Sequence, residues 1–306
     1  MQGQGGSWCD LHQYRIILPR AAVMRLTACV KCGMPDIDMS VLSLPERLAQ
    51  CLLASEPAQK VALTQTLWTE WQQDQLSAAE AEARVGIANP GRPHKPLLVS
   101  PMQVPRRRLG SREGHAAMIH AITHIEFNAI NLALDAAHRF ADMPVAYYAD
   151  WLRVAAEEAH HFALLNQHLV SLGYAYGDFD AHAGLWEMAQ KTTHDPLHRM
   201  ALVPRVLEAR GLDATPAITQ KLQQIGDIRA VDILGIIAHD EIGHVAVGSR
   251  WFAFLCAQRG LDPAVTFRDV LREYDIPPPR LPINLEARRQ GGFSELELAW
   301  LSTPAI

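Results

Sequence analysis

The chain has 306 residues, of which 49% are hydrophobic and 20% are charged, an ordinary balance for a globular protein. Its net charge of −5 excludes an overall basic field that would recruit nucleic acid. No apolar run approaches the ~20 residues of a membrane-spanning helix, and the five irregularly spaced cysteines do not make a disulfide framework. We therefore expect a cytoplasmic protein that does not cross a membrane.

Residues 1–38 begin with a glycine-rich stretch and show no sustained periodicity, so we expect a disordered leader there. The aperiodic pattern of the leader ends at Met39, and a helical pattern begins there. Met39 is therefore an alternative start of translation. Cys29 and Cys32 form a CxxC pair within this leader. A structural zinc ribbon needs a second such pair, and none follows, so coincidental spacing is the favoured interpretation.

Residues 39–100 are predicted to form an N-terminal helical extension followed by a proline-rich connector. Ser43 has the character of an N-cap, and Glu46, three residues later, completes a capping box before a helix over 44–54. An amphipathic pattern predicts a second helix over 58–84. Closely spaced prolines then favour an extended connection to the next part of the chain.

Residues 101–260 are predicted to form a four-helix bundle, because the helical patterns are long and alternating strand patterns of useful length are missing. The long helices are expected over 113–140, 142–173, 197–210 and 227–260. Gly211 is expected to end the third of them, and Pro216 to start a short separate helix. The prolines after residue 275 indicate that the C-terminal tail, 261–306, is largely extended and wraps the bundle. The fold class is therefore all-α.

Two of these helices carry the same short motif. The second helix contains Glu158-x-x-His161, and the fourth contains Glu241-x-x-His244, each pair preceded by another acidic residue. Side chains three residues apart leave the same face of a helix, so each pair can hold one metal ion from one helix.

A single carboxylate stands at a similar position in each of the other two helices. Glu126 precedes Glu158 by 32 residues, and Glu208 precedes Glu241 by 33, so the chain contains an internal repeat of two helix pairs. Four carboxylates and two imidazoles suit iron or manganese, and four negative charges balance two divalent cations. Without cations, four buried carboxylates would repel one another or take up protons.

The neighbours of these motifs leave alternatives open. Glu157 and Asp240 each precede a motif glutamate and point elsewhere, either to solvent or to a hydrogen bond with a liganding histidine. Glu157 with His160 is a competing register, but only Glu158 with His161 matches the fourth helix. Arg205, one turn before Glu208, is expected to pair with a carboxylate of the site.

Three segments of the chain resemble the family of bacterial ferritin-like proteins catalogued as DUF455. They are EAHHF, LVPRVLEARGLD and HDEIGHV, starting at residues 158, 202 and 239, and the resemblance spans roughly 44–300. It implies a ferritin-like four-helix bundle with a dinuclear site. More distantly, the chain is similar to the bacterial di-iron hydroxylases that modify tRNA. By this resemblance Glu126 and His161 would bind one ion, Glu208 and His244 the other, and Glu158 and Glu241 would bridge them.

These observations predict a di-iron carboxylate oxidoreductase that activates O₂ and oxidises an unidentified small-molecule or macromolecular substrate. Two iron ions are the expected cofactors, with manganese or a mixed manganese–iron pair as alternatives. The alternative function is iron handling, namely ferroxidation, storage or peroxide scavenging without an organic substrate. The net negative charge disfavours a nucleic acid partner. The distant similarity to tRNA-modifying hydroxylases nevertheless leaves tRNA as a candidate substrate. A homodimer is compatible with the sequence. We expect a substrate pocket beside the third and fourth bundle helices.

Overall fold

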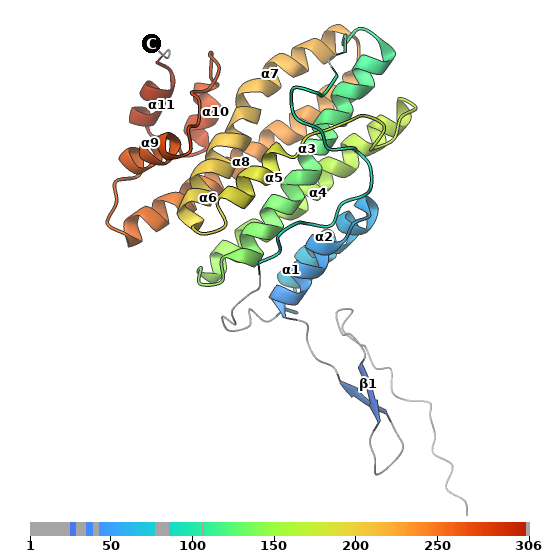
Figure 1. Ribbon diagram of the computed structural model, residues 1–306, viewed down its shortest axis with the longest axis vertical. Coiled ribbons are helices and arrows are strands. Elements are labelled where there is room, and N and C mark those ends of the chain that lie inside the picture. The colour runs from blue at the N-terminus through green and yellow to red at the C-terminus, as the bar shows by residue number, and fades with distance from the viewer. Residues whose placement is uncertain (1–24, 29–34, 39–42, 77–85, 106, 304–306) are drawn as a thin grey trace, which may run out of the picture.

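The computed structural model describes residues 25–28, 35–38, 43–76, 86–105 and 107–303. Two short strands, β1 (Arg25–Ala28) and β2 (Pro35–Asp38), pair antiparallel. Apart from its connecting segments, the rest of the described chain is helical and forms a bundle (Figure 1), which confirms the predicted all-α class. None of the described helices is long and apolar enough to cross a bilayer. Most of the predicted leader, with its CxxC pair, lies outside the described residues, so its disorder stays a prediction.

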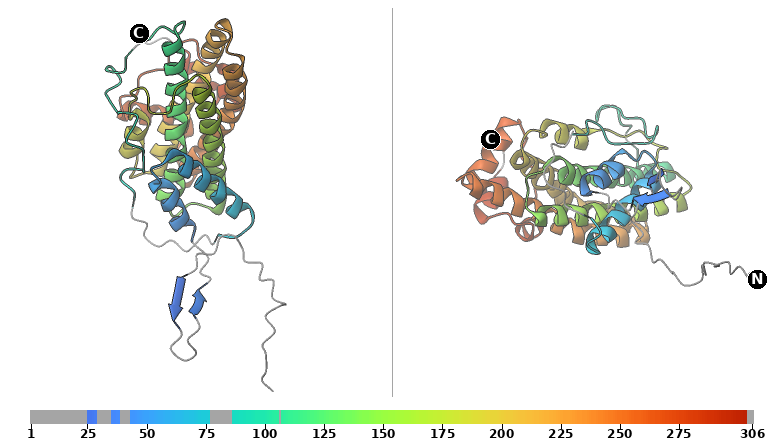
Figure 2. Two further views of the ribbon diagram at one scale, coloured as in Figure 1. Left: turned by 90° about the vertical axis from the view of Figure 1, so that its right-hand side faces the viewer. Right: turned by 90° about the horizontal axis from the view of Figure 1, so that it is seen from below.

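The N-terminal extension consists of α1 (Leu44–Leu53) and α2 (Pro57–Gln72). The predicted capping box is present, and the Ser43 backbone N–H donates to Glu46 at 3.1 Å. The buried Lys60 ammonium donates to two carbonyl groups at the end of α1, those of Cys51 and Leu52, at 2.8 Å each. The two helices pack against the next two helices of the chain at one end of the bundle (Figure 2). The second helix ends earlier than the predicted residue 84, and residues 77–85 lie outside the described chain.

Four long helical runs form the body of the molecule. They are α3 (Arg112–Arg139), α4 (Val145–Ser171), the continuous run of α6 (Pro196–Leu202), η1 (Val203–Glu208) and α7 (Ala209–Gln224), and finally α8 (Ile228–Gln258). The η1 segment is one stretch of π-helix, and a further short helix, α5 (Gly184–Lys191), was not predicted. Helix α3 packs along α4, and the third run packs along α8, so the two predicted helix pairs are present.

The predicted break between the third and fourth helices is wrong in its position. The third run does not end at Gly211 but continues through Pro216 to the end of α7. A proline inside a helix removes the hydrogen bond to the carbonyl group four residues earlier. Here that carbonyl group, on Leu212, accepts a hydrogen bond from the Asn284 side chain at 3.4 Å. The C-terminal segment therefore replaces the partner that the proline removes.

The predicted extended character of the tail is also wrong for much of its length. Three helices lie there: α9 (Pro263–Glu273), α10 (Leu285–Gln290) and α11 (Glu295–Leu301). Each begins after a side chain that caps its first turn, on Asp262, Asn284 and Ser294 respectively. The prolines at 277–279 lie in the extended link between α9 and α10. The helices pack against α6, α7 and α8, so the tail does cover the bundle.

Arg205 pairs with this tail and not with the metal-ligand candidates, which corrects the sequence-based expectation. Its guanidinium donates to the Glu297 carboxylate of α11 at 2.6 Å, and its side chain is only 2% exposed. The same guanidinium lies 4.2 Å from the ring centre of Phe267 and close to two further phenylalanine rings. A buried charge of this kind needs its partner, so the pair anchors the tail to η1.

Candidate metal centre

The six predicted ligands come from four helices that surround the middle of the bundle. Glu126 lies on α3, Glu158 and His161 on α4, Glu208 at the end of η1, and Glu241 and His244 on α8. Ligand atoms of Glu126, Glu158, His161 and Glu241 all lie within 4.8 Å of one another. The i, i+3 spacing on α4 and α8 thus directs both motifs into the same space.

Glu158 lies between the two histidines of the motifs. Its Oε2 is 3.3 Å from Nδ1 of His161, and its Oε1 is 3.0 Å from Nδ1 of His244. Nδ1 of His161 is also 3.3 Å from Glu126, and Nδ1 of His244 is 3.8 Å from Glu241. One carboxylate thus faces both halves of the repeat, which is the position that a bridging ligand needs.

Glu208 reaches the cluster from the π-helical stretch. This local widening of the helix lies directly against α8, where Pro204 contacts Gly248 so closely that an added Cβ would lie 2.2 Å from the proline ring. Single π-helical turns are frequent at functional sites because they displace one side chain from the regular helical position. The pKa of Glu208 lies well above its usual range because the carboxyl group is buried and faces the negative charge of Glu241.

The buried carboxylates of the cluster need positive charge close by to balance them. Burial, together with the charge of Glu158, also raises the pKa of Glu126 well above its usual range. Burial disfavours charge on His161, yet the carboxylates of Glu126 and Glu158 outweigh it and raise the pKa of this histidine to about 11. The pKa of His244 rises for a similar reason, the nearby charge of Glu158. Protons or metal cations must compensate this number of buried carboxylates.

Several buried ligand atoms have no hydrogen-bond partner. They are Oε2 of Glu126, Oε1 of Glu158, Oε2 of Glu208, Oε2 of Glu241 and Nδ1 of His244. Leaving one buried polar group unsatisfied costs about 1–3 kcal/mol, and these atoms belong to residues whose charges interact with one another. Some of these atoms lie close to one another, but the angles between them do not allow a hydrogen bond. Lone pairs directed into a shared space fit divalent metal ions, so the residues present suit a dinuclear centre.

The acids that precede each motif form crossed contacts between α4 and α8. Oε2 of Glu157 lies 2.9 Å from Nε2 of His244, and Oδ2 of Asp240 lies 3.0 Å from Nε2 of His161. Of the two roles left open by the sequence, the structure therefore shows the contact with histidine. A carboxylate that accepts the Nε2 proton leaves Nδ1 free as a metal ligand. His160, from the competing register, is exposed and lies outside this cluster.

We expect metal binding to release protons and to weaken as the pH falls. Liganding histidines and carboxylates must be deprotonated, whereas the raised pKa values of Glu126, Glu208, His161 and His244 favour their protonated forms. An indicator dye in weakly buffered solution would detect the release, and titrations at about pH 6 and about pH 8 would compare affinities. Equal affinity at both pH values would contradict this prediction, and Glu158→Ala is the control that should release no protons.

A cavity of about 230 Å³ lies between the 89–98 segment, α3 and α5. It is lined in part by His124, Phe127 and Tyr176. This position differs from the one we expected, beside the third and fourth bundle helices. His124 contacts Tyr176 at 2.8 Å, so this histidine is a satisfied polar residue in the cavity wall.

The fold and this site define a helical-bundle protein with a buried carboxylate–histidine cluster. The chain belongs to the DUF455 family, described as "Protein of unknown function", whose sequence profile matches residues 53–299. An uncharacterized protein of Haemophilus influenzae is 56% identical to it over 216 residues, which cover 68% of this chain and 75% of that protein. No solved structure matches the chain. The resemblance noted in the sequence is therefore confirmed at the level of this family.

Proposed function

We propose that this protein is a di-iron carboxylate oxidoreductase of ferritin-like type, acting in the cytoplasm, that activates O₂ to oxidise a substrate. The observation that carries the proposal is a cluster of four close ligands, Glu126, Glu158, His161 and Glu241. His244 joins it through Glu158, Glu208 joins it through its charge interaction with Glu241, and five buried atoms of the set lack hydrogen-bond partners. Mixed oxygen and nitrogen ligands suit iron, and manganese or a mixed pair would fit the same donors.

In this proposal Glu126 and His161 would hold one ion, Glu208 and His244 would hold the other, and Glu158 and Glu241 would bind both. The bound iron ions would supply the electrons that reduce O₂. Asp240 and Glu157 orient the two imidazoles through their Nε2 atoms and keep Nδ1 available.

Apolar residues stand next to three of the ligands and limit the access of water to the cluster. Phe127 follows Glu126, Phe162 follows His161 and Val245 follows His244, and all three are almost fully buried. The rings of Phe127 and Phe162 pack 5.5 Å apart, and Phe127 also lines the 230 Å³ cavity. A dry site protects an oxidant from side reactions with water. We therefore propose the cavity as the approach of a small substrate, although a macromolecular substrate would fit the same metal chemistry.

Iron handling is the alternative, because the same ligands would serve a ferroxidase. The 89–98 segment and α5 favour the enzyme, since together with α3 they enclose the proposed substrate cavity and contribute nothing evident to a storage cage.

Adding excess Fe(II) to the protein in air separates these functions. The enzyme should consume O₂ in a small, fixed ratio to its metal centre and should accumulate no ferric mineral. Glu158→Ala, which loses a central ligand, is the control for background iron oxidation. Uptake of hundreds of iron atoms into a large soluble assembly would overturn the oxidoreductase proposal in favour of storage.

A further inference from the structure

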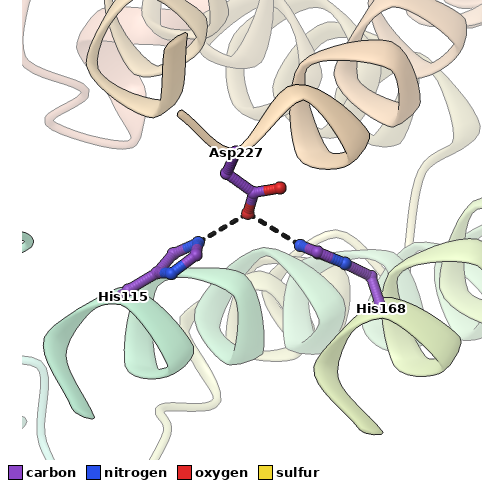
Figure 3. A group of neighbouring side chains, drawn as sticks. All are labelled: His115, His168 and Asp227. Carbon is purple, nitrogen blue, oxygen red and sulfur yellow. Dashed lines mark hydrogen bonds and ion pairs between the residues drawn. The ribbon is translucent and has the colours of Figure 1, made fainter. Parts of the chain in front are cut away.

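A second group of potential metal ligands lies at one end of the bundle, where three helices meet (Figure 3). His115 lies in the first turn of α3, His168 in the last turn of α4, and Asp227 caps the start of α8. Nε2 of His115 is 2.5 Å from Oδ2 of Asp227, and Nε2 of His168 is 2.7 Å from the same oxygen. His168 follows His161 by seven residues, so this group lies about 10 Å along α4 from the dinuclear centre.

The carboxylate of this group is held in a fixed orientation. Oδ1 of Asp227 accepts a hydrogen bond from the Ala230 backbone N–H at 3.0 Å, which caps α8. Gly226, in the left-handed region at φ +80°, makes the turn that ends α7 and places the aspartate. Oδ2 is therefore left to face the two imidazoles, as Figure 3 shows.

Ser171 is placed to favour a proton on Nδ1 of His168. The Ser171 hydroxyl donates to the His168 backbone carbonyl group at 2.6 Å, so its oxygen is available as an acceptor for Nδ1–H of the same histidine, 3.3 Å away. With its proton on Nδ1, a neutral imidazole presents a lone pair at Nε2. That lone pair faces a carboxylate oxygen at 2.7 Å. Two acceptors at this distance require a cation between them, which is either an extra proton or a metal ion.

We propose that His115, His168 and Asp227 bind one divalent transition-metal ion of the zinc class, with water completing its coordination. Two imidazoles and one carboxylate are a common set of three protein ligands for such an ion. The side chains of His168 and Asp227 are only 5% and 7% exposed, whereas that of His115 is 18% exposed and leaves a path for the ion and the water. Binding forms two nitrogen–metal bonds and one oxygen–metal bond, and the protons displaced from between these atoms go to solvent.

The ion would tie the start of α3, the end of α4 and the start of α8 together. Because such an ion binds the native state, it stabilises the fold by mass action. This site does not depend on the proposed oxidase function, since it shares no ligand with the dinuclear centre.

Zinc binding to single-residue variants of the full chain tests the proposal. Asp227→Asn keeps a side chain that caps α8 equally well but removes the anionic ligand, and His115→Gln removes one imidazole. His198→Gln is the matched control, because His198 is also partly buried and lies outside the cluster, where it contacts the Tyr274 hydroxyl at 3.0 Å and the ring of His194.

After equilibration with Zn²⁺ and dialysis, elemental analysis should find about one zinc ion fewer per chain in both cluster variants than in the wild type and the control. The rise in melting temperature that zinc gives the wild type should shrink in these variants and persist in the control. This difference holds whether or not the dinuclear centre also takes zinc. Equal zinc content and equal thermal shifts in all four proteins would overturn the proposal and leave a purely hydrogen-bonded contact between the helices.

Discussion

Replacing Glu158 or His161 with alanine should remove most of the metal that the proposed dinuclear centre binds. Glu158 contacts both motif histidines, through Oε2 to His161 and Oε1 to His244, so its loss affects both ion positions. His161 contacts two of the carboxylates, on Glu126 and Glu158. Elemental analysis of protein reconstituted with Fe(II) or Mn(II) measures the loss directly.

Neighbouring residues on the same helix supply the controls for this experiment. Glu157→Ala should lower metal affinity less, since this residue touches the site through Nε2 of His244 and not as a ligand, and changes to such outer partners typically cost 10–100-fold in affinity. His160→Ala should have no effect, because this side chain is exposed outside the cluster. If His160→Ala removes the metal and His161→Ala does not, the assigned register is wrong.

Replacing Glu297 with alanine should destabilise the protein strongly. The change leaves the Arg205 guanidinium buried without its ion-pair partner, among phenylalanine rings at 4.2 to 4.7 Å. Removing one partner of a buried ion pair typically lowers the free energy of unfolding by about 3–5 kcal/mol. Urea denaturation followed by circular dichroism measures this difference.

Two variants of the same helix separate the ion pair from the helix cap. Glu297→Gln keeps a side chain suited to the capping box with Ser294 but removes the charge, so it should remain strongly destabilising. Glu295→Ala, two residues earlier, removes an exposed contact with Arg289 and should leave stability nearly unchanged. Equal stability losses at 295 and 297 would show that the buried pair is not the cause.

Local signals in the sequence were sufficient for the long helices and for bringing the six ligands together. Caps such as Ser43 and Asp227 and the apolar periodicity predicted where the long helices start to within a few residues, but not where each of them ends. The i, i+3 spacing is a local property of a helix, so Glu158 with His161 and Glu241 with His244 could be paired from the sequence. The internal repeat then indicated Glu126 and Glu208 as the remaining members.

Long-range contacts explain what the sequence could not reveal. Helix α7 continues through Pro216 because Asn284, far along the chain, bonds the carbonyl group of Leu212. Arg205 was assigned to the metal site because its partner lies 92 residues away in a short helix that was not predicted. His168 and Asp227 are 59 residues apart and carry no shared motif. The caps of the tail helices, for example Asp262, and the amphipathic pattern of α9 could have indicated that the tail is not extended.

The anomalous scattering of iron in a crystal of the iron-loaded protein tests the central claim most directly. Carboxylate-bridged ions in two-metal sites lie about 3.5–4 Å apart. We predict two iron peaks at that separation, between the carboxylates of Glu126, Glu158, Glu208 and Glu241 and the Nδ1 atoms of His161 and His244. A crystal with no iron between these residues would contradict the dinuclear centre, and with it the proposed oxidoreductase.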